Sequence, residues 1–400
     1  MYMTVGLFKS MATIMALSLM VLLFASGCKK DNNGPAENLG LPQIIHFYRD
    51  ADTVGGVVHI YGKNFSKYLA HNTVIFNSKE ATPFYSDNDT LLVKVPAGAT
   101  TGKISVKVYD NTAVSIDTFY VTTGRWTKLA DFPGDGRITT VAFAVNNTGY
   151  MGTGSGNSNY LKDFWKYNQS ADNWSQLSDF PGGYRMEAIS FVIGNNVYVG
   201  LGTNTNTFTT VNDLYVYNTS ADTWIREPDE PFHFNNNPVA LAINGKGYII
   251  TGSYYFQVAE FDPLIGWNLK ANFPGTGRSS ATGFVIGNKG YIAGGNSGSS
   301  GDLRDLWEYD PSTDTWTEKA AMRHGGYNTT GFSINGKGYV GNEQEFWEYD
   351  RVTDTWTRKT DFPGSTYIYR VSFVLNNVAY VACGLSSSNE TSKEVWKFEP

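Results

Sequence analysis

The sequence predicts an all-β protein in which a small β-sandwich precedes a ring of six similar four-stranded sheets. Aromatic residues make up 15% of the chain and glycine occurs 42 times, a composition typical of many short strands joined by tight turns. Short alternating apolar runs begin near residue 41, and from residue 125 the chain repeats itself every 40 to 50 residues. A period of this length is typical of propellers.

The N-terminal region, residues 1–28, has the features of an export signal. Its apolar run, Met11–Ala25, is shorter than the roughly 20 residues of a membrane span but fits a secretory signal. Ala25-Ser26-Gly27-Cys28 resembles a bacterial lipobox, although Ala25 stands where Leu is usual. The resemblance implies lipidation at Cys28 and an outer-membrane lipoprotein facing either the periplasm or the outside. An uncleaved anchor helix is the alternative. Residues 29–40 are expected to be a flexible tether.

Residues 41–122 are expected to form the β-sandwich, because short strands alternate there with turn residues. Two elements, Ile60–Phe65 and Val95–Gly98, resemble those of an IPT/TIG domain. The resemblance implies an immunoglobulin-like fold with Phe65 in its core. It also implies a structural role, in which the domain spaces the second domain from the membrane.

The repeat from residue 125 has fixed internal spacing. Trp recurs at intervals of 48, 50, 43, 49 and 40 residues, starting at Trp126. A Pro stands seven positions after each Trp except the fifth, where Arg323 takes its place. Each unit then contains an apolar strand, a strand with an invariant Tyr, an aromatic strand and a Trp strand. Four strands per unit correspond to one propeller blade.

These six units resemble kelch repeats over residues 125–400, which implies a six-bladed kelch-type β-propeller. The last unit ends after Val395–Phe398 and lacks a Trp strand, whereas Arg125–Ala130 precedes the first complete unit. We expect the early strand to complete the last sheet, because pairing the two ends closes the ring and leaves no exposed edge.

The connections predict where a ligand would bind. The link between the second and third strands varies from 10 to 19 residues across the units. In a propeller, this loop and the link between blades emerge on one face, where binding residues tend to lie. Equivalent positions of the between-blade links, six residues before the first-strand anchor, carry Arg137, Arg185, Asn235, Arg278, Gly326 and Tyr367, with Arg370 nearby in the sixth link.

Kelch domains that bind peptides use arginines at this location, so the resemblance implies a polar pocket at the mouth of the central channel. Arginine clusters suit carboxylates or hydroxyl-rich ligands. Alternatively, these arginines satisfy loop carbonyls and acids between the blades. The variable loops add Tyr160, Phe208 and Tyr254 among small polar residues, which could stack on sugars or cover the blade edges.

Several function classes do not fit the sequence. The net charge is −6 without a basic run, which argues against nucleic acid. The two cysteines, Cys28 and Cys383, cannot build a metal site or a disulfide framework, and Cys383 follows an apolar strand as a buried thiol would. A copper radical oxidase of the galactose-oxidase type needs His ligands that are missing from the propeller repeats, which contain only His233 and His324. We therefore expect no metal and no cofactor.

The sequence thus predicts a non-catalytic lipoprotein of the cell envelope that binds a glycan or an envelope protein on the loop face of its propeller. The alternative is a carbohydrate-active enzyme similar to the kelch-type sialic acid epimerase. In that case Arg137, Arg185 and Arg278 would hold a carboxylate, and Glu187 would be a candidate base. Resemblance in fold alone does not support this activity.

Overall fold

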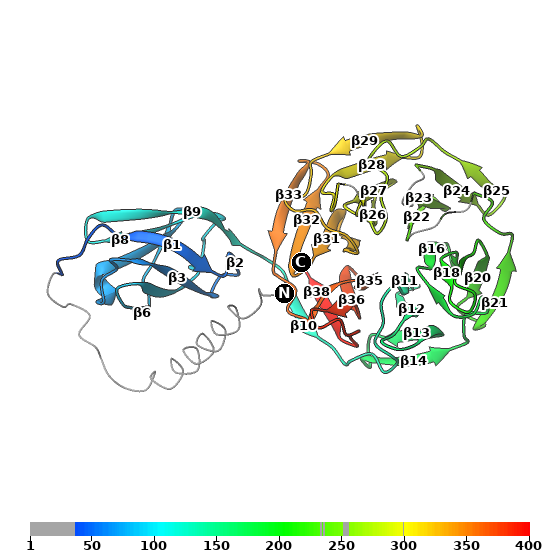
Figure 1. Ribbon diagram of the computed structural model, residues 1–400, viewed down its shortest axis with the longest axis horizontal. Helices are drawn as coiled ribbons and strands as arrows, with labels where there is room; N and C mark the ends of the chain where they lie inside the picture. The colour runs from blue at the N-terminus through cyan, green and yellow to red at the C-terminus, as the bar shows by residue number, and fades with distance from the viewer. Residues whose placement is uncertain (1–36, 233, 235–236, 251–255, 299) are drawn as a thin grey trace, which may run out of the picture. The chain divides into compact units, whose positions relative to one another are not determined.

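The computed structural model describes residues 37–232, 234, 237–250, 256–298 and 300–400. These residues form two compact units (Figure 1). The first contains Val54–Phe119 with the described residues up to Asp50, and the second contains Ala51–Thr53 with Tyr120–Pro400. Cys28 and the export signal lie outside the described residues. No helix within the described ranges is long and apolar enough to cross a membrane.

The first unit has the sandwich that the sequence predicts. One sheet has the order β1-β3-β7-β6, and most of the second sheet, β9-β8-β4-β5, belongs to the same unit, with β2 added at its edge. The elements are β1 (Gln43–Tyr48), β2 (Ala51–Asp52), β3 (Val57–Lys63), a 3-10 turn (Leu69–His71), β4 (Asn72–Phe76), β5 (Lys79–Ala81), β6 (Tyr85–Ser86), β7 (Thr90–Lys94), β8 (Gly102–Val108) and β9 (Asn111–Val121).

Alternate residues of the strands face the core of this sandwich, as in Val58 and Ile60 of β3, which are fully buried. Phe65 is also fully buried, which confirms its predicted place. The turn before it needs glycine, because a Cβ atom on Gly62 would lie 2.0 Å from the Gln43 carbonyl oxygen and 2.3 Å from the Phe65 ring. Asn64 completes the turn with a φ of 61°.

The second unit is a propeller, and its described residues form six four-stranded sheets around a central axis (Figure 1). From the centre outward, the first three sheets are β11 (Val141–Val145), β12 (Thr148–Ser155), β13 (Tyr160–Asn168), β14 (Asn173–Leu177); β16 (Ile189–Ile193), β17 (Asn196–Gly200), β20 (Leu214–Asn218), β21 (Thr223–Glu227); and β22 (Val239–Ile243), β23 (Lys246–Ile250), β24 (Val258–Asp262), β25 (Gly266–Leu269).

The other three sheets are β26 (Thr282–Ile286), β27 (Lys289–Ala293), β28 (Leu306–Asp310), β29 (Thr315–Lys319); β30 (Thr330–Ile334), β31 (Lys337–Asn342), β32 (Glu345–Asp350), β33 (Thr355–Lys359); and β35 (Val371–Leu375), β36 (Val378–Ala382), β38 (Val395–Glu399), β10 (Arg125–Lys128). The last sheet joins the two ends of the propeller. β10 pairs antiparallel with β38, with Trp126 opposite Phe398, which confirms the predicted closure of the ring.

Aromatic side chains fill the space between neighbouring sheets. Phe373 of β35 lies over the backbone of β12, where a Cβ atom on Gly149 would come within 2.2 Å of its ring. The same relation holds for Phe191 with Gly247 and for Phe284 with Gly338. In these three units, the glycine that precedes the repeated Tyr therefore leaves space for an aromatic ring of the preceding sheet, and this contact fixes the packing of one blade on the next.

Cys383 belongs to this core. It is 2% exposed, and its Sγ lies 3.8 Å from the Met151 sulfur. Burial raises the pKa of its thiol to about 12. The prediction of a buried thiol is confirmed.

Candidate functional site

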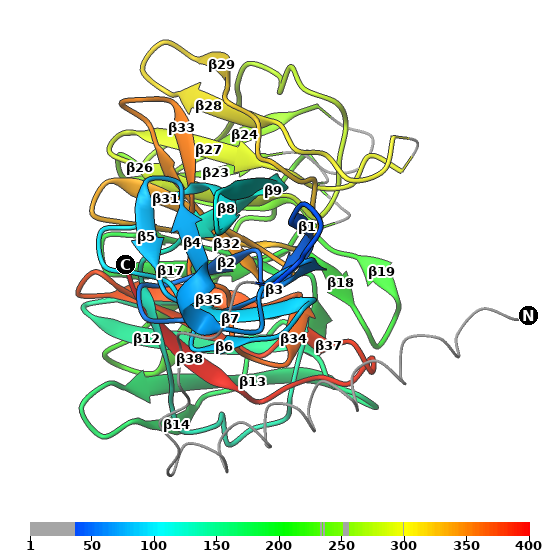
Figure 2. The ribbon, with the colours of Figure 1, turned by 90° about the vertical axis from the view of Figure 1, so that its left-hand side faces the viewer.

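The links between sheets and the loops between second and third strands lie on one face of the propeller, here called the loop face. Short extra strands join the two kinds of connection: β15 (Arg185–Met186) pairs with β18 (Thr203–Asn204), which continues to β19 (Thr209–Thr210), and β34 (Thr366–Ile368) pairs with β37 (Leu385–Ser386). Figure 2 shows β18, β19, β34 and β37 on one side of the propeller. The prediction that both connections share a face is confirmed.

The structure corrects the expectation that Arg137, Arg185 and Arg278 line an open pocket. All three side chains are fully buried. Each guanidinium forms two parallel hydrogen bonds to one carboxylate, with N···O distances of 2.6–2.9 Å. The partners are, in order, Asp163, Asp213 and Asp305. Asp163 lies within β13, whereas Asp213 and Asp305 directly precede β20 and β28.

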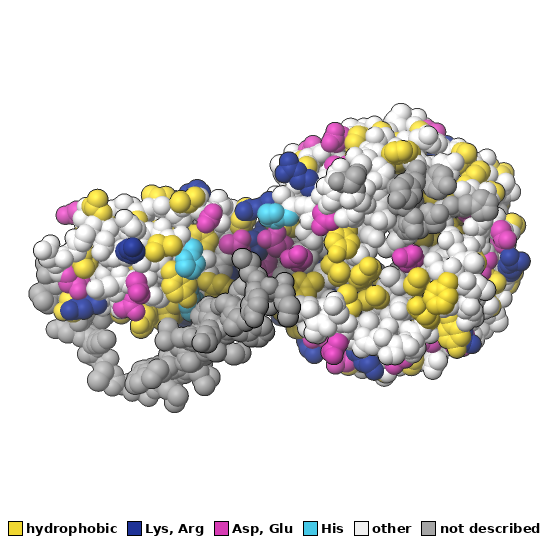
Figure 3. Space-filling view, in the orientation of Figure 1, with side chains coloured by type: hydrophobic (Ala, Val, Ile, Leu, Met, Phe, Trp, Pro, Cys, Tyr) yellow, Lys and Arg dark blue, Asp and Glu magenta, His cyan; other side chains and the backbone are white. Residues whose placement is uncertain are grey.

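The remaining contacts of these arginines are also internal. Each donates to a carbonyl just after the second strand's Tyr, for Arg137 that of Thr153 at 3.1 Å. Each also lies over an aromatic ring, which is Phe132 for Arg137. Each arginine therefore connects the link that precedes a blade to that blade. This agrees with the alternative in which the arginines satisfy carbonyls and acids of the propeller instead of binding a ligand. Figure 3, which views the loop face, shows the visible Lys and Arg side chains of the propeller at its rim.

The arginines lower the pKa values of two of these carboxylates. Burial alone would raise the pKa of Asp163, but the hydrogen bonds and charge of Arg137 outweigh burial and hold that pKa below its usual value. The same balance lowers the pKa of Asp305 beside Arg278. Both acids are therefore charged and occupied by their arginines.

Arg370 is buried as well, at 4% exposed, and lies over the Phe362 ring at 4.5 Å. It donates to the carbonyls of Thr366 and Glu343. Burial lowers its pKa to about 9. Arg370 also lines the central channel, where a cavity of about 210 Å³ is bounded by residues of the inner strands. Asn235 and Tyr254, the other predicted ligand residues of this part of the face, lie outside the described residues.

The sequence did not predict a ring of strained residues at the channel mouth. In the link that leads into each inner strand, one residue close to the start of the strand has a positive φ of 50–60°. The six are Thr139, Glu187, Asn237, Ser280, Asn328 and Tyr369. Each lies two positions after one of the six equivalent link positions, Arg137 to Tyr367, that the sequence analysis compared. The spacing of the repeat was therefore sufficient to locate these residues. None is glycine, although glycine would adopt this conformation without strain.

The ring residues contact one another around the axis. The Tyr369 amide donates to the Asn328 carbonyl at 2.9 Å, and the Asn328 amide donates to the Ser280 carbonyl at 2.9 Å. On the opposite side, the Glu187 amide donates to the Thr139 carbonyl at 3.2 Å. The channel mouth is thus a polar ring with one carboxyl group, that of Glu187.

The carboxyl of Glu187 should make folding depend on pH. Burial raises the pKa of Glu187 above its usual value. A raised folded pKa means that the stabilising contribution is complete below the unfolded pKa and is lost as pH rises through the folded pKa. Glu187→Gln, which stays uncharged, is therefore expected to melt above the wild type at neutral pH. The difference should shrink on acidification in melting curves between pH 3.5 and 8, and a difference independent of pH would contradict this assignment.

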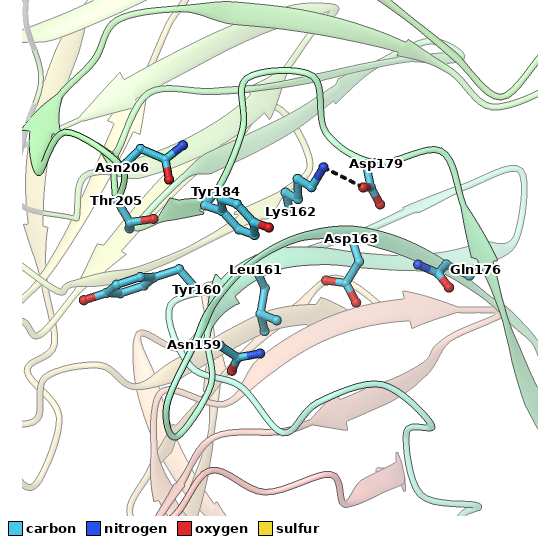
Figure 4. Close-up of a pocket in the computed structure, with 10 residues that line it drawn as sticks. All are labelled: Asn159, Tyr160, Leu161, Lys162, Asp163, Gln176, Asp179, Tyr184, Thr205 and Asn206. Atoms are coloured by element: carbon cyan, nitrogen blue, oxygen red, sulfur yellow. Dashed lines mark ion pairs between the residues drawn. The ribbon is translucent and has the colours of Figure 1, made fainter.

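A cleft of about 510 Å³ lies on the loop face between the first and second blades and is here called the Tyr160 cleft. Figure 4 shows the rings of Tyr160 and Tyr184 on its walls, with Thr205 and Asn206 on the loop at one end. Phe208, 66% exposed, meets the Tyr160 ring edge-on at 5.8 Å. The predicted residue Tyr160 therefore lies in a cleft, away from the central channel.

Charged groups in the Tyr160 cleft are paired. The Lys162 Nζ lies 3.0 Å from the Asp179 carboxylate, a pair drawn in Figure 4, and 5.6 Å from the centre of the Tyr184 ring. Asp163, also on the wall, is held by Arg137 beneath it. The cleft thus offers aromatic faces, amides and hydroxyls rather than a spare charge.

A second cleft of about 300 Å³ lies on the same face and contains Tyr367, another predicted residue. Tyr367 is 36% exposed and shares this cleft with Tyr327, Asp302 and Glu343. The structure thus distributes the predicted ligand residues over two clefts and the blade interior instead of collecting them around the channel. Within the described ranges, no three His, Cys, Asp or Glu residues are grouped as metal ligands.

The fold and its loop face define a β-propeller with an accessory immunoglobulin-like domain, and comparison with known protein families matches one segment of each unit. The model of the kelch motif matches residues 277–323, and that of the IPT/TIG domain matches residues 47–122. The propeller thus contains a kelch motif, and the first unit is matched by the IPT/TIG domain.

Among solved structures, YjhT has a similar fold, with a TM-score of 0.58 and 18% sequence identity over 67% of this chain and 95% of the YjhT chain. No curated protein matches the sequence.

Proposed function

We propose that this protein is a non-catalytic binding protein of the cell envelope that holds a glycan in the Tyr160 cleft. The observation that carries the proposal is the composition of that cleft, in which two tyrosine rings stand among amide and hydroxyl groups. Ligand sites commonly combine apolar and aromatic walls with a few directed polar groups. Sugars present apolar C–H faces and a rim of hydroxyls, which match those two kinds of surface.

The proposal includes the way in which the protein is held at the envelope. The lipobox-like segment ending at Cys28 supports a lipid anchor in the outer membrane, with residues 29–40 as the tether and the IPT/TIG domain as a spacer. The loop face would then present the Tyr160 cleft to glycans outside the membrane.

The test is a glycan array probed with the chain that begins after Cys28. Tyr160→Ala and Tyr184→Ala are each expected to weaken binding about tenfold or more, because aromatic anchors carry much of the energy of such sites. Tyr367→Ala is the matched control, since Tyr367 is a similarly exposed tyrosine in the second cleft, and it should bind as the wild type does.

Two results would count against glycan binding in this cleft. Loss of binding in Tyr367→Ala alone would move the site to the second cleft. An empty array together with capture of envelope proteins would favour a protein ligand on the loop face.

One observation favours a second candidate, a carbohydrate-active enzyme of the epimerase type. Glu187 lies in the strained ring at the channel mouth, and burial raises its pKa toward the range of a general acid or base. The buried arginines argue against a carboxylate site there. Incubation with sialic acid, followed by NMR of its anomers, tests this candidate. Accelerated interchange that is lost in Glu187→Gln would establish it.

A further inference from the structure

The sheet β1-β3-β7-β6 of the first unit (Figure 2) has an aromatic outer face, on the side away from the core. Residues that alternate with this face, such as Ile60 and Leu91, are fully buried in the core. The outward residues are Tyr48, His59, Leu92 and Tyr85 in one row across the four strands, and His46 and Tyr61 in the next row. This layer is here called the aromatic face.

The rings of the aromatic face are in contact with one another. The His46 and Tyr61 rings stack with their centres 4.7 Å apart, and the His59 ring lies 6.4 Å from both the Tyr48 and the Tyr61 ring. Tyr48 is nevertheless 57% exposed, and Ile45, in the bulge of β1, is 56% exposed. A contiguous exposed layer of apolar and aromatic groups marks an interaction surface.

The aromatic face also differs in charge from the outer face of the second sheet. Strands β1, β3, β6 and β7 contain no Asp or Glu, and their only Lys or Arg residues are Lys63 and Lys94. The second sheet carries exposed charges of both signs, among them Glu80, Lys103 and Asp117. The aromatic face is therefore apolar and weakly basic, with no carboxylate on its strands.

The chain that leads into this sheet is held against the first unit. The Glu37 carboxylate accepts hydrogen bonds from the Ser66 hydroxyl and, at 3.2 Å, from the Lys67 amide. The Glu37 amide donates to the Tyr109 hydroxyl at 3.0 Å. Glu37 lies nine positions after Cys28, where we propose the lipid anchor. Nine fully extended residues span at most about 30 Å, so a lipid on Cys28 would keep the unit at the bilayer surface.

We propose that the aromatic face rests on the membrane surface, with the lipids of the bilayer as its partner. This inference rests on the lipid anchor, which is part of the proposed function. Rings with a polar tip suit the headgroup region, where one end of the side chain is apolar and the other is hydrated. A short tether gives an effective concentration in the millimolar range, so a weak contact with the lipids is sufficient.

The charges of the aromatic face fit this partner. Lys63 and Lys94 lie at opposite ends of the face, because Lys63 ends β3 and Lys94 pairs with Val57 at its start. Lysines at such a surface are attracted to anionic headgroups. Burial and the charge of Arg49 lower the pKa of His59. His59 is therefore neutral at neutral pH and loses no charge hydration at the interface.

Quenching by labelled lipids tests the proposal on the lipidated protein in vesicles of phosphatidylethanolamine and phosphatidylglycerol. Tyr48→Cys carries the dye, and Cys383 does not compete for it, since Cys383 is 2% exposed and its thiol pKa is raised to about 12. Lipids with a nitroxide on the acyl chain should quench this dye at least about twofold, because interfacial side chains reach the acyl boundary. The controls are Ile116→Cys, on the second sheet, and Val352→Cys, on the propeller, both 85% exposed in the wild type, and their dyes should be quenched much less.

Charge substitution tests whether the aromatic face itself makes the contact. With the dye at Val57→Cys, the pair Ile45→Glu and Tyr48→Glu should reduce quenching about twofold or more, since carboxylates lose hydration and are repelled by anionic lipids. The matched control is the pair Val114→Glu and Ile116→Glu on β9, whose wild-type residues are also exposed, at 58% and 85%. The control pair should leave quenching unchanged, and neither pair should shift the melting temperature, because all four side chains are exposed.

The outcomes separate this inference from the glycan site. Equal quenching at positions 48 and 116, or none at either, would overturn contact through the aromatic face. Protection of the position 48 dye from iodide in water, without quenching by the labelled lipids, would show that a protein surface covers the face instead. Ile45→Glu with Tyr48→Glu should bind glycans as the wild type does. If mass spectrometry finds no lipid on Cys28, the anchor and this inference fail together, and the glycan array still tests the Tyr160 cleft.

Discussion

Replacing Arg137 with methionine is expected to destabilise the propeller by about 3–5 kcal/mol in urea denaturation. This is the range for breaking a buried ion pair by removing one partner. Arg137 is fully buried and makes two bonds to Asp163 and one each to the carbonyls of Thr153 and Asp135. Methionine fills similar space but removes the donor of both carbonyls and leaves the carboxylate with the Trp165 Nε1 donor, at 2.6 Å, and without its counter-charge.

The variants chosen as controls identify the cause of this loss. Arg137→Lys keeps the charge but cannot form two parallel bonds to the carboxylate, so its loss should be intermediate. Arg226→Met removes an arginine whose carboxylate partner, Asp229, is equally close at 2.7 Å. Both side chains of that pair are more than half exposed, so we expect a change within about 0.5 kcal/mol.

The prediction for Arg137 also has a pH signature. The lowered pKa of Asp163 contributes stability above its unfolded pKa, and this contribution is lost as pH falls through the folded pKa. The destabilisation caused by Arg137→Met should therefore be largest near neutral pH and smaller in acid. If Arg137→Met unfolded at the same urea concentration as the wild type, Arg137 would be available for a ligand after all.

The spacing of the repeated residues predicted the propeller well, because the strands of one blade must keep fixed lengths in order to pack on the next blade. The position of Trp126, opposite Phe398, followed from the unit that lacked its last strand. Gly149 and Gly338 fit the same scheme, since each leaves room for a ring of the preceding sheet. Packing of this kind leaves a period in the sequence that can be counted without a structure.

The role of the arginines was harder to predict because it depends on a partner distant in the sequence. Arg137, Arg185 and Arg278 occur in the three units that have an Asp directly before the first fully buried apolar residue shared by the third strands, which is Phe164, Leu214 or Leu306. That coincidence was the available signal for an internal pair. The Tyr160 cleft left no such signal, since its walls combine β13 and β14 of the first blade with loops of the second blade whose spacing varies. Tyr160 correctly indicated the face of the site, but its neighbours Tyr184 and Thr205 could not be predicted from the spacing of the repeat.

Replacing Trp126 with alanine is expected to cost about 3 kcal/mol or more and to open the ring where its ends meet. The indole of Trp126 lies 4.7 Å from the Phe398 ring and 4.8 Å from the Phe346 ring, so it joins the closing strand to the last sheet and to the fifth. Its Nε1 donates to the Thr360 carbonyl at 2.9 Å. Removal of a large aromatic side chain from such a contact has a cost in this range.

The matched control is Trp316→Ala, because Trp316 holds the same position in the fourth sheet and donates to the Ala271 carbonyl at 3.2 Å. Both variants lose an indole, but the strand of Trp316 is covalently continuous with its own sheet, whereas β10 is joined to β38 only by pairing and packing. Native-state hydrogen exchange should therefore show faster exchange in β10 and β38 for Trp126→Ala alone. Equal losses of stability, with no selective exchange at these two strands, would mean that the joined ends are no weaker than any other part of the ring.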